Sequence, residues 1–128
     1  MPETQFTLDT ADGYKIHGLL NKAKGKKNKK AVLFVHGLTG HVREYLPSIM
    51  AQRFPDLGYD VIRIDLYSWS DKGRSILDVT LKIHGQDIDT TMDHFSKKYD
   101  QIFAVGHSYG GPSLMLSDQT QFEAFSLW

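Results

Sequence analysis

Short apolar runs alternate along the chain with polar segments, and residues that favour turns separate them. Three continuous apolar runs predict buried strands, at residues 31–35, 59–64 and 102–105. Residues 5–9 instead alternate apolar and polar side chains, as a half-buried strand does, and residues 14–20 are expected to return from them after a turn at Asp12 and Gly13. Residues 124–128 predict the start of a sixth strand.

Segments with helically spaced apolar side chains lie between these strands. They predict helices at residues 44–54, 76–99 and 108–117. Pro47 and Pro112 fall in the first turn of two of them, where a missing amide hydrogen is tolerated, and Gly85 is a candidate break in the longest. Strands that alternate with helices indicate an α/β fold. We expect a mostly parallel sheet that begins with an antiparallel hairpin.

Several polar side chains within these elements could have a chemical role or could simply face solvent. Asp78, His84, Asp87 and His94 belong to the second helical segment, where charged and imidazole groups more often face solvent than take part in chemistry. His17 is interpreted as an outward-facing residue of its strand. We therefore expect all five on the surface.

The third apolar run continues into Gly106-His107-Ser108-Tyr109-Gly110, the G-x-S-x-G pattern of a strand that turns sharply into a helix. Such a turn holds the serine in a strained backbone conformation, and side chains at the two glycine positions would collide with the neighbouring strand and helix. Ser108 is therefore the candidate nucleophile, with its hydroxyl clear of the sheet. The alternative is a serine with a purely structural role in a turn.

Two further segments accompany this motif. Residues 31–35 end in His36-Gly37-Leu38-Thr39-Gly40, and residues 60–65 are followed by a loop rich in serine and glycine up to Ser75. In this order, the three segments resemble the α/β-hydrolase family. The resemblance implies a serine hydrolase that acts on carboxylic esters or related acyl substrates, without a cofactor or a metal.

The same resemblance assigns roles to individual positions. It implies that the backbone N–H groups of Leu38 and Tyr109 form the oxyanion hole. Five residues support the motifs: His36, Gly37, Gly106, His107 and Gly110. Of these, His36 is expected to hold its loop and His107 to point away into the structure. His41 is a candidate for the pocket wall or, alternatively, the surface, and Asp65 is interpreted as a loop anchor.

The triad partners of this family follow the serine in the order Asp or Glu, then His. After Ser108 the only acids are Asp118 and Glu123, and no histidine follows. We therefore interpret residues 1–128 as the N-terminal portion of one α/β-hydrolase domain: a truncated form, a proteolytic product or one piece of a split protein. Alone it should show no useful esterase activity, and it should bind the missing half or a second copy of the chain.

Composition excludes few function classes. The net charge is zero, so nothing steers the whole chain toward nucleic acid or an anionic membrane. Residues 21–30 carry six lysines, which predict an exposed connection. Cysteine is absent. Residues 1–5 lack the charged and apolar pattern of a secretory leader, and no run approaches membrane-spanning length, so we expect neither feature. We expect a soluble, cytoplasmic protein. A non-catalytic binding or assembly module is the alternative, and nucleic-acid binding through Lys22 to Lys30 is the least favoured.

Overall fold

A six-stranded sheet runs through the centre of the molecule, whose structure is a computed structural model that describes residues 3–25 and 29–128. The strands are β1 (Glu3–Asp9), β2 (Lys15–Asn21), β3 (Lys30–Val35), β4 (Asp60–Ile64), β5 (Gln101–Gly106) and β6 (Phe125–Leu127). Their order across the sheet is β1-β2-β4-β3-β5-β6. β2 is antiparallel to β1 and β4, whereas β4, β3, β5 and β6 are mutually parallel. The predicted α/β class, parallel sheet and opening hairpin are confirmed.

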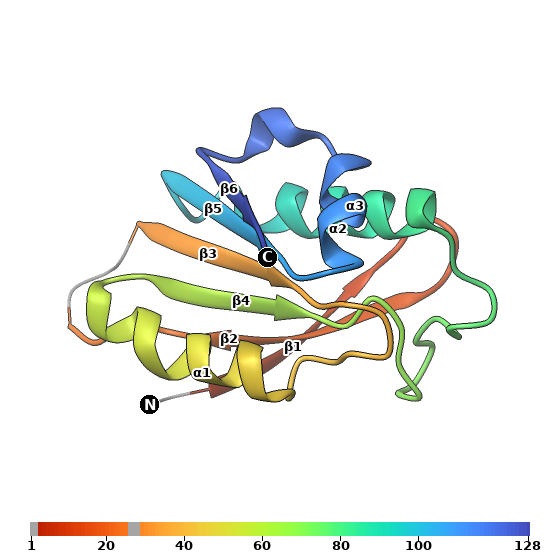
Figure 1. Ribbon diagram of the computed structural model, residues 1–128, viewed down its shortest axis with the longest axis horizontal. Coiled ribbons are helices and arrows are strands. Elements are labelled where there is room, and N and C mark those ends of the chain that lie inside the picture. Colours follow the sequence, from red (N-terminus) through yellow and green to blue (C-terminus); the bar gives the residue numbers. More distant parts are fainter. Residues whose placement is uncertain (1–2, 26–28) are drawn as a thin grey trace.

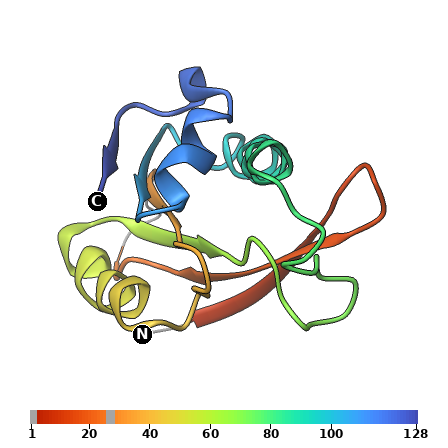
Figure 2. The ribbon, with the colours of Figure 1, turned by 45° about the vertical axis from the view of Figure 1, so that its right-hand side comes forward.

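Helices cover both faces of this sheet (Figures 1 and 2). α1 (Tyr45–Arg53) lies on one face and is extended by a short 3-10 turn, Phe54–Leu57. α2 (Leu81–Phe95) and α3 (Gly110–Met115) lie on the other, followed by a second 3-10 turn, Gln119–Gln121. Along β3, Leu33 and Val35 belong to the core beneath α2 and α3, whereas Val32 and Phe34 belong to the core beneath α1. A continuous apolar run therefore reflects a strand buried on both sides.

The second helix is shorter than predicted, and Gly85 does not divide it. Its first residue is Leu81, because Thr80 caps the helix by accepting a 3.2 Å hydrogen bond from the amide of Ile83. Gly85 instead permits close packing against the end of α3. A Cβ atom at this position would lie 2.5 Å from the carbonyl oxygen of Leu116.

Two polar residues of α2 contradict the expected surface location. His84 has no exposed area, and Asp87 is only 2% exposed, whereas Asp78 and His94 are exposed as expected. The reason is that His84 and Asp87 lie on the face of α2 that turns toward the sheet and toward the segment after β4. His17 is half-buried, and its Nε2 lies 2.7 Å from the carbonyl oxygen of Asp71.

The lysine-rich connection is described only in part. Lys22, Lys24 and Lys29 are exposed as predicted, whereas residues 26–28 lie outside the described residues. Asn21 corrects the expected start of this connection, because it is the buried last residue of β2 and accepts a hydrogen bond from Arg63. None of the described helices combines the length and the apolarity that a membrane-spanning helix needs.

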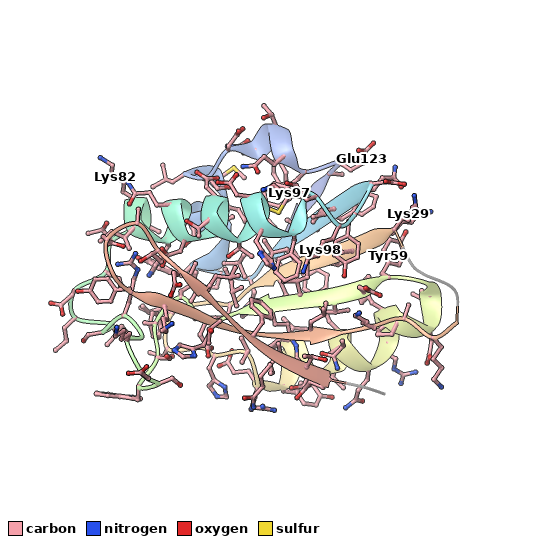
Figure 3. All side chains as sticks on the ribbon, turned by 180° about the vertical axis from the view of Figure 1, so that it is seen from behind. Lys29, Tyr59, Lys82, Lys97, Lys98 and Glu123 are labelled. Carbon is pink, nitrogen blue, oxygen red and sulfur yellow. The ribbon has the colours of Figure 1, made fainter. Side chains whose placement is uncertain are left out.

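The direction of the parallel strands decides where a site can form. Lys29, Tyr59 and Glu123, each of which precedes a parallel strand, lie at one end of the sheet (Figure 3). The loops that follow β3, β4 and β5 meet at the opposite end (Figure 1). Ligands of open α/β sheets bind at this carboxyl end of the strands.

Candidate functional site

Ser108 occupies a tight turn between β5 and α3, at the carboxyl end of the parallel strands. Its φ of 52° lies in the left-handed region, which a residue with a side chain adopts only at a cost of about 1–2 kcal/mol. The turn is fixed on both sides, because the amide of His107 donates to Val35 O at 3.0 Å and that of Ser108 to Trp128 O at 2.8 Å. Ser108 is nevertheless exposed. A strained, exposed serine held by its neighbours is the geometry predicted for the turn.

The glycines at either end of this turn stand where a side chain would not fit. At Gly106, a Cβ atom would lie 2.8 Å from both Gly110 O and the Cδ1 atom of Leu114. At Gly110, a Cβ atom would overlap the carbonyl oxygen of Val35. The strand and the helix therefore approach each other closely enough for glycine alone.

The loop after β3 packs directly against the serine. A Cβ atom at Gly37 would lie 3.3 Å from Cβ of Ser108 and 3.2 Å from the carbonyl oxygen of His107. Within the described part of the chain, the N–H groups of Leu38 and Tyr109 make no hydrogen bond. Both donors are thus available to a ligand. Thr39, whose φ is 63°, is a second strained residue of the site.

The side chain of His36 holds this loop through two contacts with backbone groups. Its buried ring lies between two backbone groups: Nδ1 is 2.7 Å from Gly37 O, and Nε2 is 3.0 Å from the amide nitrogen of Leu66. Because the Leu66 N–H can only donate, Nε2 accepts and Nδ1 carries the proton. Burial lowers the pKa of His36, which favours this neutral form. His107 is half-buried, and its Nδ1 lies next to Gly37.

An aromatic cluster that the sequence did not reveal lies behind the turn. The ring of His84 packs against Tyr67, with centroids 6.1 Å apart, and edge-on against Tyr109 at 5.4 Å. The Tyr67 ring also meets His36 at 5.3 Å. Neither ring nitrogen of His84 has a hydrogen-bond partner among the described residues. Burial, with help from His36 and Arg74, lowers the pKa of His84 to about 4.

The segment between β4 and α2 is anchored by a buried cation. Arg74 donates two hydrogen bonds to Asp87 of α2, at 2.7 and 2.9 Å, and two to Asp12 of the β1–β2 turn, both at 2.9 Å. Burial raises the pKa of Asp87 and Arg74 opposes that shift, while the hydrogen bonds from Arg74 lower the pKa of Asp12. This three-residue network fixes a long irregular segment beside the site.

The remaining candidates fall near the site without contacting Ser108. Asp65 accepts a 2.9 Å hydrogen bond from the amide of Val42, which agrees with its interpretation as a loop anchor. His41 is exposed and also lines a cavity beside the loop. Asp118 caps the turn at Thr120, and Glu123 is exposed. Among the described residues, no histidine forms a hydrogen bond with Ser108, and no cluster of three His, Asp or Glu side chains could hold a metal ion.

Comparison with known proteins identifies relatives of this fold. The sequence pattern of the Hydrolase_4 family, described as serine aminopeptidase, S33, matches residues 26–121. No curated protein matches the chain. Est1E from Butyrivibrio proteoclasticus is 25% identical with a TM-score of 0.80, over 94% of this chain and 48% of that protein. An Est1E structure with ferulic acid bound gives a TM-score of 0.84 at 25% identity, with 94% and 50% covered.

A third solved structure shares the fold at lower identity. The esterase Pf2001 from Pyrococcus furiosus is 19% identical with a TM-score of 0.77, and 97% of this chain covers 49% of it. The chain therefore spans about half the length of these proteins. The matched pattern extends over most of the sequence, and the chain belongs to the Hydrolase_4 (serine aminopeptidase, S33) family of α/β-hydrolases.

Proposed function

We propose that Ser108 is the nucleophile of a serine hydrolase that acts on carboxylic esters or related acyl compounds. The observation that carries this proposal is the backbone of Ser108: an exposed serine with a φ of 52°, packed against Gly37 of the loop after β3. Strain at an exposed nucleophilic residue is a feature of functional sites. The similarity of this chain to Est1E supports the substrate class. One Est1E structure has ferulic acid bound, and ferulic acid is a carboxylic acid, the kind of product that ester hydrolysis releases.

The chemistry follows from the two free amides. When Ser108 Oγ attacks an acyl carbon, the carbonyl oxygen becomes an oxyanion, and the N–H groups of Leu38 and Tyr109 would stabilise it. Each such donor contributes on the order of 3 kcal/mol to the transition state. The hydroxyl proton must pass to a base and then to the leaving group. Neither His36, whose ring nitrogens both contact backbone groups, nor the buried His84 is placed to accept it.

We further propose that the triad acid and histidine belong to sequence outside these 128 residues. Loss of triad members costs around a million-fold in turnover and leaves about a thousand-fold over water from the oxyanion hole and binding. The isolated chain should therefore hydrolyse p-nitrophenyl butyrate only weakly. In the complete protein, a fluorophosphonate probe should label Ser108 rapidly.

The variants Ser108→Ala and Ser126→Ala test this assignment in the complete protein. Ser126 is a matched control, because it is also exposed but lies in β6 and not at the turn. S108A should abolish labelling and hydrolysis, and S126A should preserve both. Labelling that survives S108A would refute the nucleophile. Ser108-dependent hydrolysis at ordinary enzyme rates by the isolated chain would refute the proposal that the catalytic base lies outside these 128 residues.

A non-catalytic binding or assembly module is the second candidate. It is favoured by exposed apolar residues at the edge of the sheet: Phe125 and Leu127 of β6 are 40% and 53% exposed, and Trp128, which follows β6, is 49% exposed. An unpaired apolar edge invites association with another chain or segment. This alternative predicts that the complete, folded protein resists the fluorophosphonate probe, whereas the hydrolase predicts rapid labelling.

A further inference from the structure

A cavity of about 370 Å³ lies beside the loop after β3. One wall is formed by Thr39, Gly40 and His41 of that loop, and the other by the segment between β4 and α2, including Tyr67, Trp69 and Ile76. The volume lies within the range of about 300–1,000 Å³ that is typical of sites for small molecules. No part of the chemistry described above uses this cavity.

The charged groups that reach the cavity are already bound within the protein. Arg74 is held by Asp12 and Asp87 through four hydrogen bonds, and Asp65 accepts one from the Val42 amide. A charged ligand would have to compete with these internal partners. Ser68 and Ser75 also line the cavity, but most of its exposed surface is apolar, which favours an uncharged, apolar group.

Trp69 indicates which apolar group fits. Its side chain is fully exposed, at 101% of the reference area, and its indole has no aromatic partner in the described part of the chain. Tyr67 contributes a second ring to the same cavity. Aromatic rings attract other rings in offset or edge-on packing beyond the effect of buried area alone. A planar ring in the cavity would contact Tyr67, and the exposed indole of Trp69 is free to pack on the outer side of that ring.

The loop after β3 joins the cavity to the proposed nucleophile. Gly37 packs against Ser108, while Thr39 and Gly40 line the cavity. The hydroxyl of Tyr67 is 3.4 Å from the carbonyl oxygen of Gly37. We propose that the cavity binds an uncharged planar ring of the acyl substrate, while the carbonyl group of that substrate lies at Ser108. This inference rests on the proposed function for the carbonyl, but the ring site itself can be tested without catalysis.

Tryptophan fluorescence of the 128-residue chain provides the test. The chain has two tryptophans, so the W128F variant leaves Trp69 as the only reporter. Titration with 4-phenyl-2-butanone, an uncharged ketone that carries a ring, should change the Trp69 emission saturably. The alkyl ketone 2-octanone should bind at least about tenfold more weakly, because it lacks the ring contacts. No saturable change, or equal affinity for both ketones, would refute the ring site.

Substitutions at two adjacent exposed residues locate the binding. Ile76→Glu places a carboxylate at the cavity, which disfavours an apolar ligand, and should weaken binding of 4-phenyl-2-butanone about tenfold. Leu77→Glu is the matched control, because Leu77 is 89% exposed and does not line the cavity. Equal losses in both variants would refute the assignment. The titration needs no catalysis, whereas the fluorophosphonate probe reports only on Ser108, so a failed nucleophile and a failed ring site give different results.

Discussion

The amide of Leu66 donates a 3.0 Å hydrogen bond to Nε2 of the buried His36, and this bond joins the end of β4 to the loop after β3. The other ring nitrogen, Nδ1, donates a hydrogen bond to the carbonyl oxygen of Gly37 in the same loop. One neutral imidazole thus satisfies a donor and an acceptor from two different segments. The position of Gly37 against Ser108 depends on this ring, which makes His36 a positioning residue.

The first prediction concerns the loss of that ring. His36→Ala leaves the buried N–H of Leu66 without a partner and opens a cavity. We expect the free energy of unfolding to fall by about 1–3 kcal/mol, measured by urea denaturation. His41→Ala, in the same loop but exposed, should change it by less than about 0.5 kcal/mol. Equal effects of the two substitutions would contradict the bracing role.

The second prediction is a loss of stability in mild acid. The pKa of His84 is lowered from 6.5 to about 4 in the folded chain, mainly by burial. Between these values the unfolded state binds more protons, so the free energy of unfolding falls as the pH drops from 6.5 toward 4. His84 alone contributes a loss of about 3 kcal/mol, because each pH unit corresponds to about 1.4 kcal/mol. Urea denaturation at several pH values in this window measures the loss.

Two substitutions in α2 separate His84 from the other titrating groups. His84→Leu removes a buried imidazole whose nitrogens have no hydrogen-bond partner among the described residues, so the decline between pH 6.5 and 4 should become shallower. His94→Gln, at an exposed site on the same helix, should keep most of the decline. If H84L left the pH dependence as steep as in the unmodified chain, the assignment to His84 would be wrong.

The third prediction addresses the buried ion pair between Arg74 and Asp87, whose side chains are 7% and 3% exposed. Arg74→Met leaves the carboxylate of Asp87 buried without its cation and should cost about 3–5 kcal/mol. Asp12→Asn should cost less than about 1 kcal/mol, because the side chain of Asp12 is 54% exposed. Chemical denaturation of both variants measures the difference.

A double substitution tests the origin of that cost. If the penalty of R74M comes from an unpaired buried charge, then adding Asp87→Leu should recover part of the lost stability, because both charges are then absent. Losses that simply add would mean that the two side chains do not interact. With W128F added, the fluorescence of Trp69, on the segment that Arg74 anchors, would report whether that segment stays ordered.

The pattern of apolar residues along the sequence was sufficient to predict the strands, but it did not predict which polar residues are buried. Alternating and continuous apolar runs located every strand in the described chain to within two residues. Four of the seven buried residues of α2 have the spacing of a single helix face: His84, Ile88, Met92 and Phe95. That spacing could have placed His84 inside, but a general preference of polar groups for solvent outweighed it. Burial of Asp87 depends on Arg74, thirteen residues earlier, and no local pattern specifies this pair.

Some features of the site are specified by neighbouring residues, and others depend on residues that are distant in the sequence. The turn at Ser108 is specified by neighbouring glycines and was therefore predictable from its motif. The cluster of Tyr67, His84 and Tyr109 joins three segments, so it emerges only when the sheet brings them together. The cavity beside Trp69 has the same origin, because its two walls come from loops that follow different strands.

The last prediction compares two adjacent glycines at the start of α3. At Gly110 a Cβ atom would overlap the backbone oxygen of Val35, which cannot move without disturbing β3, so Gly110→Ala should destabilise the fold by more than about 2 kcal/mol. At Gly111 the nearest atom to a Cβ would be Leu127 Cδ2 at 3.5 Å, an ordinary contact. Gly111→Ala should therefore be neutral or stabilise by up to about 1 kcal/mol, since alanine favours helix. Thermal unfolding of both variants decides the matter, and equal melting temperatures would mean that the turn is not closed by contact with β3.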